Sequence, residues 1–319
     1  MKAAVYDTPG APDVLKYVDI PDPTLGPDDV LVRVEAISIE GGDLINRRTT
    51  PPPHPAWVVG YAASGTVAAV GANVHSRRVG DRVAAFDMQG SHAQLWAVPA
   101  GRTWLVPDGV EAADAAVLPI AFATAQHCLF TRGVLRHGET VVIQAAAGGV
   151  GLAAVQLAAQ AGATVIAVAS GAQRSERLMA LGAQHVVDRV VDDVPDTVLQ
   201  ITHGKGADLI IDPVGTTLSS SLSALAAQGR LVFVGNAGGD NLSVDLWPAM
   251  QANQTLLGVF MGPLFETPTV RASVNHLLQA VASGRIRPVI ERTFPLAEAA
   301  AAHAFAETAK PLGRIVMIP

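Results

Sequence analysis

Residues 144–151 read Gln-Ala-Ala-Ala-Gly-Gly-Val-Gly, and they join an apolar, strand-like stretch (139–145) to a helix-like stretch of small residues (149–161). From Ala145 to Gly151 the spacing is A-x-x-G-x-x-G, a variant of the G-x-G-x-x-G pattern of dinucleotide-binding folds. Small residues let the main chain approach the oxygens of a diphosphate, and the free N–H groups at a helix start attract negative charge. The pattern predicts a dinucleotide-binding loop, with a tight turn that binds nothing as the alternative. The predicted contacts are Ala147, Gly148, Gly149, Val150 and Gly151.

Strand-like and helix-like stretches alternate on the C-terminal side of this loop. Apolar strand candidates lie at 163–169, 185–187, 207–212 and 230–234. Their apolar residues are continuous rather than alternating, which indicates strands that are covered on both faces. We therefore predict an α/β fold with a Rossmann-type, doubly wound parallel sheet.

The N-terminal third has a different texture. Residues 29–37 alternate between apolar and polar side chains, residues 82–86 form another short strand candidate, and turn-forming clusters lie at 51–53 and 80–81. Short strands with frequent turns predict a β-rich domain, either a small barrel or a sandwich. The tail, 294–319, contains an alanine-rich helix candidate and a final strand candidate at 314–318.

The composition limits the classes of function. The chain has 319 residues, 50% of them hydrophobic and 16% charged, which is enough apolar material for two domains with a shared core. A net charge of −6 without a Lys/Arg cluster gives no reason to expect a nucleic-acid partner. Cys128 is the single cysteine, so no internal disulfide can form, and we interpret it as a buried, unreactive thiol. No unbroken run of 18 apolar residues is present, and we expect a cytoplasmic protein without a membrane span.

The end of the second predicted strand bears on the choice of dinucleotide. It reads Ser170-Gly171-Ala172-Gln173-Arg174, without the acidic residue that usually binds the ribose 2′-hydroxyl of NAD. An arginine there suits a 2′-phosphate, because its planar fork binds phosphate through two hydrogen bonds. We predict NADPH rather than NADH, with Ser170 and Arg174 as contacts and Arg177 as a second candidate. The alternative is that these arginines belong to a solvated helical turn.

Motifs spread over nearly the whole chain carry a resemblance to a known family. They include Met1-Lys2-Ala3, the stretch 29–34, Gly80-Asp81-Arg82-Val83, the loop at 145–151, Ala161-Gly162-Ala163, Leu181-Gly182-Ala183, Gly235-Asn236, the stretch 295–299, and Gly313-Arg314-Ile315-Val316. In this order and spacing the chain resembles the zinc-independent, zeta-crystallin-like quinone oxidoreductases of the medium-chain dehydrogenase/reductase superfamily. The resemblance implies a GroES-like catalytic domain (1–118 and 263–319), an inserted Rossmann domain (119–262), and an active site in the cleft between them.

The same resemblance predicts that the protein holds no metal. In zinc-dependent relatives a cysteine and a Gly-His-Glu segment bind the catalytic zinc, and the matching positions here are Glu40 and Gly60-Tyr61-Ala62. A structural zinc on four cysteines is excluded by the single Cys128, and no two histidines have helical i, i+3 or i, i+4 spacing. Without a metal to acidify an alcohol, reduction of an electron-poor acceptor is favoured. We predict an NADPH-dependent oxidoreductase that acts on a quinone or an α,β-unsaturated carbonyl compound (enone).

The candidate catalytic residues are Tyr61, Glu40 and Asp43. The Tyr61 hydroxyl would project from the position of the missing zinc ligand and serve as a proton donor, although a ring that only fills this space is the alternative. Glu40 stands where the family usually has asparagine, and ionised glutamate would repel a growing oxyanion. Three interpretations therefore stay open. Burial keeps Glu40 protonated, so that it acts as a general acid, or the substrate differs from simple quinones. Alternatively, Glu40 pairs with Arg47 or Arg48 and only shapes the pocket.

Three further residues are expected to contact the cofactor, and two others are expected to have structural roles. Thr124 matches a threonine that forms a hydrogen bond near the nicotinamide, and Gly235-Asn236 ends a strand whose backbone would reach the nicotinamide ribose or carboxamide. Asp43 is also expected to form a structural ion pair with Arg47. His92 stands where relatives have an aromatic residue and is interpreted as a packing or surface residue.

Two other functions stay open at this point. One is a specialised enoyl or ketone reductase that tailors a single natural-product-like substrate. The other is a non-catalytic NADPH-binding protein of the crystallin type. We also expect a homodimer, because the apolar stretch 255–260 can pair across a two-fold axis at the edge of the sheet.

Overall fold

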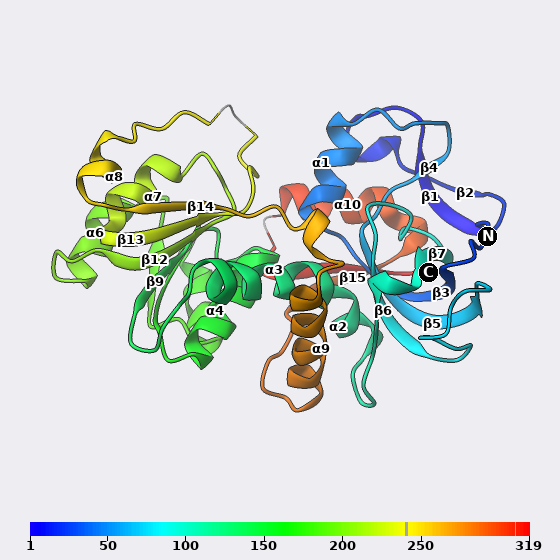
Figure 1. The fold of residues 1–319 in the computed structure, drawn as a ribbon. Coiled ribbons are helices and arrows are strands. Elements are labelled where there is room, and N and C mark those ends of the chain that lie inside the picture. Colours follow the sequence, from blue (N-terminus) through cyan, green and yellow to red (C-terminus); the bar gives the residue numbers. More distant parts are fainter. Residues whose placement is uncertain (240–241, 310) are drawn as a thin grey trace. The chain divides into compact units, whose positions relative to one another are not determined.

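The structure, a computed structural model, describes residues 1–239, 242–309 and 311–319. The chain divides into two compact units, one formed by Met1–Ala123 with Gly262–Pro319 and the other by Thr124–Met261. The boundaries predicted from the sequence lie at 118 and 262. Each unit has its own sheet system (Figure 1). Each also has its own apolar core.

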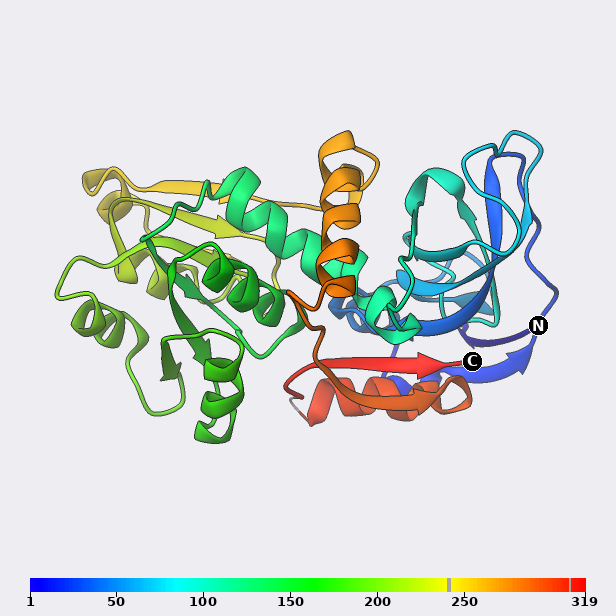
Figure 2. The same cartoon turned by 90° about the horizontal axis from the view of Figure 1, so that it is seen from below.

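Residues 124–261 form a Rossmann-type unit around one parallel sheet of six strands. The strand order is β11-β10-β9-β12-β13-β14, which becomes 3-2-1-4-5-6 when the strands are counted from β9. Helices cover both faces, with α4 against β9 and β10 and α7 against β12 and β13 (Figures 1 and 2). The elements are α3 (Ala123–Gln126), η4 (His127–Arg132), β9 (Thr140–Ile143), α4 (Gly149–Gln160), β10 (Thr164–Ala169), η5 (Ala172–Arg174), α5 (Ser175–Ala180), β11 (His185–Asp188), α6 (Val194–Ile201), β12 (Ala207–Asp212), α7 (Leu218–Ala224), β13 (Leu225–Phe233), α8 (Trp247–Gln251) and β14 (Thr255–Gly258).

The predicted strands of this unit are present, with differences at their ends. β12 has the predicted bounds, and all pairings within the sheet are parallel, as the continuous apolar runs indicated. β9 ends two residues earlier than predicted because Ala145 adopts a left-handed backbone conformation with φ of 49°. β13 begins five residues earlier than predicted, and its pairing with β12 shifts register between Ala207 and Leu209. Beyond this irregularity, residues 209–212 of β12 pair with residues 230–233 of β13 in regular parallel register.

The other unit is the β-rich, GroES-like one. It holds a sheet of order β15-β16-β3-β5-β6-β8, in which β7 also pairs with β3, and a small sheet of order β2-β1-β4. The elements are β1 (Lys2–Tyr6), η1 (Pro12–Val14), β2 (Lys16–Asp19), β3 (Asp29–Ser38), α1 (Gly41–Thr49), β4 (Trp57–Val58), β5 (Ala62–Val70), β6 (Arg82–Phe86), β7 (Leu95–Pro99), η2 (Ala100–Arg102), β8 (Thr103–Leu105), α2 (Ala112–Val117), η3 (Leu118–Phe122), η6 (Gly262–Leu264), α9 (Pro268–Ala282), β15 (Ile290–Pro295), η7 (Leu296–Glu298), α10 (Ala299–Thr308) and β16 (Arg314–Ile318).

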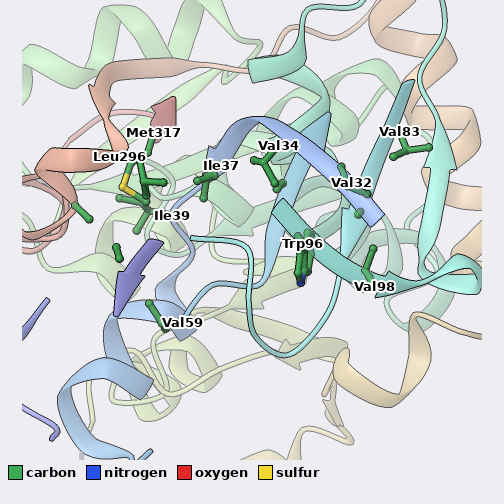
Figure 3. Close-up of a cluster of buried hydrophobic side chains, with 14 of the residues drawn as sticks. Val32, Val34, Ile37, Ile39, Val59, Val83, Trp96, Val98, Leu296 and Met317 are labelled. Atoms are coloured by element: carbon green, nitrogen blue, oxygen red, sulfur yellow. The ribbon is translucent and has the colours of Figure 1, made fainter. Parts of the chain in front are cut away.

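The core of the β-rich unit is held by strand side chains that are far apart in the sequence. Alternate residues of β3 point inward, as its alternating pattern predicted, and meet Trp96 of β7. Figure 3 shows Val32 and Val34 around the Trp96 ring, while Leu296 and Met317 from the C-terminal tail close the other end. Each such side chain contributes about 1.5–3 kcal/mol by leaving water. The tail is therefore part of this core, although some 200 residues separate it from β7.

A long apolar helical run, Ala112–Arg132, contains the boundary between the two units. Two of its segments, η3 and η4, are π-helical, and these flank the short α3. The run is long and apolar enough to cross a membrane by length and composition alone, yet 67% of its most apolar window is buried inside the protein. A buried core helix has the same properties.

Two histidines form a fully buried pair in the β-rich unit. His92 Nε2 lies 3.0 Å from His303 Nε2, so one ring donates and the other accepts, and both are neutral. Burial lowers the pKa of His92 to about 3 and that of His303 well below its usual value, with His92 and Arg47 adding to the effect on His303. Gly60 leaves the room for the pair, because a Cβ on this glycine would lie 2.0 Å from His92 Nδ1. His92 is thus a buried packing residue.

The histidine pair predicts that acid destabilises this protein. Between about pH 6.5 and pH 3 the unfolded chain binds a proton at residue 92 that the folded chain does not. The free energy of unfolding should therefore fall by about 1.4 kcal/mol per pH unit below pH 6.5, and further through His303. Urea unfolding between pH 7 and pH 5 measures this slope.

The variant His303→Gln should show a shallower slope, while His185→Gln, on an exposed residue, should keep the slope of the unmodified chain. An equal slope in all three proteins would mean that other groups carry the acid sensitivity.

Candidate functional site

The loop between β9 and α4 leaves the start of α4 open. The first intrahelical hydrogen bond of α4 runs from the N–H of Leu152 to the carbonyl of Gly148, 2.8 Å. The N–H groups of Gly149, Val150 and Gly151 precede that bond and have no partner within the helix, and no side chain caps the helix at Gly148. Three open N–H groups and the positive end of a 12-residue helix make a site for an anion such as a diphosphate.

The two glycines of this loop have different roles. At Gly151 an added Cβ would lie 2.4 Å from the carbonyl oxygen of Ala145 and 2.6 Å from Cα of Ala146, so close packing between helix and strand requires glycine. At Gly148 the only atom near an added Cβ is the Ala145 oxygen, at 3.3 Å, and the backbone is extended. Packing within the chain therefore requires glycine far less at Gly148, and the missing side chain leaves space for a ligand. The loop fits the dinucleotide that the sequence predicts.

Two arginines meet at the end of β10. The Arg174 guanidinium donates to the carbonyl of Ser170, and Arg189 Nε donates to Ser170 Oγ at 2.7 Å. Arg189, which directly follows β11, was not among the residues predicted from the sequence. The signal was available, because β11 is the parallel neighbour of β10 and its last residues lie beside Ser170.

An acidic residue also lies at this strand end. Asp188 Oδ1 accepts hydrogen bonds from the N–H groups of Gly171 and Val190, each at 3.1 Å. These bonds hold the pKa of Asp188 below its usual value, and the charges of Arg174 and Arg189 act in the same direction. The strand end therefore brings the Arg174 and Arg189 cations near a carboxylate whose oxygen already binds backbone N–H groups.

The ends of β12 and β13 lie next to each other, on the other side of β9. Gly235 lies close to the carbonyl of Pro213, since a Cβ added to this glycine would be 3.0 Å from the carbonyl oxygen. Asn236 Oδ1 lies beside Gly215, which has φ of 82°. The order of the sheet reverses between β9 and β12, and ligands of such sheets bind outside the carboxyl ends of the strands at this point. The predicted residues of the glycine loop, Ser170, Gly235 and Asn236 all follow carboxyl ends of these strands. Thr124 lies apart from them in sequence, buried in α3 between the two π-helical segments.

In the β-rich unit, Glu40 and Asp43 close the start of α1. The Glu40 carboxylate accepts from the N–H of Asp43, and Asp43 Oδ2 accepts from the N–H of Glu40 at 2.8 Å. Both side chains are buried. Burial raises the pKa of Asp43 well above its usual value, with the Glu40 charge adding to it. Burial also raises the pKa of Glu40, against the opposite effects of Arg314 and Ser38.

The arginine partners predicted from the sequence were wrong. Glu40 pairs with Arg314 of β16, at 2.6 Å, and accepts from Ser38 Oγ at 2.7 Å. Arg47, fully buried, pairs with Glu307 of α10 and donates to the carbonyl of Gly10 at 2.9 Å, so the expected Asp43–Arg47 ion pair is absent. The true partners lie about 260 residues or more further along the chain, whereas the sequence analysis considered only neighbours on the same helix.

Tyr61 lies against the same helix. Asn46 Nδ2 donates to the Tyr61 hydroxyl oxygen at 2.7 Å, and Phe86 lies edge-on to the ring. Burial raises the pKa of Tyr61 to about 12, and the Asp43 charge adds to this effect. The phenol is therefore neutral at physiological pH and holds a proton that it can donate.

Metal-ligating side chains do not gather within the described residues 1–239, 242–309 and 311–319: no group of three or more His, Cys, Asp or Glu side chains could hold an ion there. Cys128 is buried in η4, and burial raises the pKa of its thiol to about 12. This thiol is therefore neither ionised nor exposed at neutral pH, as the sequence analysis expected.

Comparison with known families and structures gives a consistent result. The model for the alcohol dehydrogenase GroES-like domain matches residues 26–108, and the model described as zinc-binding dehydrogenase matches residues 149–280. A quinone oxidoreductase of Pseudomonas aeruginosa is 34% identical over 97% of each chain. A 2-haloacrylate reductase of a Burkholderia species is 31% identical over 99% of this chain and 98% of that protein.

Longer proteins and solved structures are also similar. A phenolphthiocerol/phthiocerol polyketide synthase protein of Mycobacterium tuberculosis is 30% identical over 98% of this chain but only 14% of its own length. The quinone oxidoreductase structure of Pseudomonas syringae has a TM-score of 0.93 and 31% identity, covering 100% of this chain and 99% of that one. The Escherichia coli quinone oxidoreductase, solved in complex with NADPH, has a TM-score of 0.93 and 27% identity, with both chains fully covered.

The two loop glycines give a paired prediction. Gly151→Ala should lower the free energy of unfolding by about 1–3 kcal/mol, because its Cβ meets backbone atoms. Gly148→Ala should unfold at nearly the same urea concentration as the unmodified chain but bind NADPH at least about tenfold more weakly, because its Cβ takes the space of the diphosphate. Urea unfolding and fluorescence titration measure the two effects. Undiminished NADPH affinity in Gly148→Ala would remove this loop from the binding site.

Proposed function

The chain belongs to the zeta-crystallin-like quinone oxidoreductases of the medium-chain dehydrogenase/reductase superfamily, a family of oxidoreductases, and we propose that it is an NADPH-dependent reductase of a quinone or an enone that works without a metal. The observation that carries this proposal is the open start of α4. Its free N–H groups, beside the side-chain-free Gly148, support a diphosphate, and a dinucleotide is the cofactor that a sheet of this order binds.

NADPH is proposed over NADH because of the charge at the end of β10. Arg174 and Arg189 both reach Ser170 there, and guanidinium groups bind a 2′-phosphate well. The Asp188 carboxylate at this strand end already accepts from Gly171 and Val190, which supports the same choice. The quinone oxidoreductase of Escherichia coli, fully covered by this chain, was solved with NADPH.

When bound, NADPH supplies a hydride, and the chain has to orient it and provide a proton. We assign the proton to Tyr61, since its pKa of about 12 keeps the phenol protonated at neutral pH. Glu40 is assigned a positioning role, because Arg314, Ser38 and the start of α1 all hold its carboxylate. We give Asp43 the same role, since it caps the helix that carries Asn46. Thr124, Gly235 and Asn236 are proposed to contact the nicotinamide half.

The metal-free part of the proposal rests on the residues that replace the ligands of zinc-dependent relatives. Glu40 is engaged by an arginine, and Gly60-Tyr61-Ala62 offers a phenol in place of imidazole and carboxylate. Without a Lewis acid, an alcohol keeps a pKa too high for hydride loss at neutral pH. Reduction of an electron-poor acceptor fits these residues better than alcohol oxidation does.

A specialised reductase is the second candidate. The similarity to a segment of a polyketide synthase supports it, as does Glu40 at a position where the family usually has asparagine. Such an enzyme would reduce one bulky enone and ignore simple quinones. A crystallin-like protein that binds NADPH without turnover would reduce neither.

We further propose a cytoplasmic homodimer. Strand β14 is the edge strand next to β13 in the sheet that the described residues form. Large apolar side chains are exposed near it, with Trp247 63% and Phe260 75% exposed. Pairing of β14 with a second copy would cover these groups, which sedimentation equilibrium can test.

The arginines at β10 should determine the choice of cofactor. We expect Arg174→Ala and Arg189→Ala each to weaken NADPH binding about 10- to 100-fold and to leave NADH binding nearly unchanged, since each removes a charged hydrogen bond to the 2′-phosphate. Titration of both nucleotides measures this, with Arg136→Ala, on an exposed residue before β9, as the matched control. Equal losses for both nucleotides would show that these arginines do not bind the 2′-phosphate.

The activity itself is tested by NADPH oxidation with 9,10-phenanthrenequinone and with simple and bulky enones, before and after chelator treatment. We expect turnover that a chelator does not change, and a kcat about 10²-fold lower in Tyr61→Phe with intact NADPH binding. Turnover that the chelator abolishes would contradict the metal-free reaction. Turnover of bulky enones alone would favour the specialised enzyme, and NADPH binding without any turnover would favour the non-catalytic alternative.

A further inference from the structure

The Tyr61 ring makes specific contacts with helix α1, beyond filling space. Gly42 and Asn46 lie one helical turn apart on α1, and both face this ring. A Cβ at Gly42 would lie 2.3 Å from Tyr61 Cε2 and 3.0 Å from its hydroxyl oxygen, so only glycine lets the phenol lie this close to the helix. The position of the ring is therefore built into α1 itself.

Asn46 determines which way the Tyr61 hydroxyl donates. Its Nδ2 donates to the phenol oxygen at 2.7 Å and so occupies one lone pair of that oxygen. Within the ranges 1–239, 242–309 and 311–319 the Tyr61 hydroxyl accepts this hydrogen bond and donates none to the chain. The O–H of Tyr61 is thus left available for an acceptor outside the chain.

The same hydrogen bond affects the acidity of the phenol. Burial and the Asp43 charge both raise the pKa of Tyr61, whereas the Asn46 hydrogen bond lowers it, because an N–H donor stabilises the phenolate. Asn46 thus acts against burial and against the charges of Asp43 and Tyr6, all of which raise this pKa. Asp43 meanwhile caps the helix and fixes the turn of α1 from which Gly42 and Asn46 project.

We propose that Asn46 is a positioning residue for proton transfer, which aims the Tyr61 proton at the substrate and stabilises the phenolate left behind. This inference rests on the proposed function. When a hydride adds to the β-carbon of an enone, its electron pair forms the new C–H bond. The π electrons of the C=C bond then shift toward the carbonyl group, and the carbonyl oxygen becomes a negatively charged enolate oxygen. The Tyr61 O–H bond breaks, a new O–H bond forms on that oxygen, and water returns the proton to Tyr61. For a quinone the same proton goes to the hydroquinone oxygen.

Three variants test the role of Asn46. Asn46→Leu keeps the size of the side chain but removes the donor, and it should lower kcat about tenfold or more with little change in KM. Asn46→Asp replaces the donor by an acceptor that binds the Tyr61 proton, and it should lower kcat further. Thr49→Val, on an exposed residue of the same helix, is the matched control and should keep the kcat of the unmodified chain. In a Tyr61→Phe background, Asn46→Leu should have no further effect on kcat; an undiminished effect there would overturn the proposal.

A measurement without turnover separates this proposal from the proposed function. The chain has three tyrosines, so fluorotyrosine incorporation gives few fluorine NMR lines, and the line missing in Tyr61→Phe identifies residue 61. Fluorination makes a phenol more acidic, which brings its titration into an accessible range. This line should titrate at higher pH in Asn46→Leu than in the otherwise unmodified chain.

An unchanged titration, or an active chain whose kcat is the same in Asn46→Leu, would refute the role of Asn46 while leaving the reductase assignment intact. A shifted titration in a chain that reduces no quinone or enone would refute the reductase assignment alone.

Discussion

The start of α4 is the constraint on which the rest of the Rossmann unit depends. A helix that begins at a glycine without a capping side chain leaves N–H groups open, and burying them without a partner would be unfavourable. The chain keeps them accessible by small residues and by the tight turn at Ala145, whose left-handed backbone carries it from β9 to the helix. Gly151 holds the helix against the strand, and Gly148 leaves the approach free. The order of the sheet then brings the ends of the neighbouring strands to the same edge.

The start of α1, in the β-rich unit, is capped by side chains, whereas the start of α4 is not. At α1 the chain supplies its own anions, because Glu40 and Asp43 cap the helix reciprocally. Two buried carboxyl groups side by side repel each other when both are ionised, and Arg314 compensates for one of them. The helix is thereby closed to a ligand at its start, and its side face, with Gly42 and Asn46, becomes the surface against which Tyr61 lies. The same physical feature, a helix start with unpaired N–H groups, is open in one unit and filled in the other.

Buried polar groups hold the C-terminal tail in this second unit. Arg314 reaches Glu40 and Ser38, Glu307 pairs with the buried Arg47, and His303 pairs with His92. Each pair joins residues that are 200 or more positions apart in the sequence. Removing Glu307 or Arg314 would leave the buried Arg47 or Glu40 without its ion-pair partner, which costs more than the net contribution of the bond. The tail therefore contributes both apolar and polar contacts that keep α1, and with it the Tyr61 segment, in place.

The fold class, the glycine loop and the positions of the sheet strands could be predicted from the sequence, because these depend on local periodicity and on short motifs. Continuous apolar runs predicted the parallel sheet, and the alternation in residues 29–37 predicted β3. The partners of Glu40 and Arg47, the histidine pair, and the positions of Arg189 beside Ser170 and of Asn46 beside Tyr61 became visible only in the folded chain. Those contacts depend on which distant elements pack together, and helical or strand spacing carries no information about them. The structure could correct the local pairing of Arg47 with Asp43 because burial selects a partner by position in space, whereas sequence reasoning had only the distance along the chain.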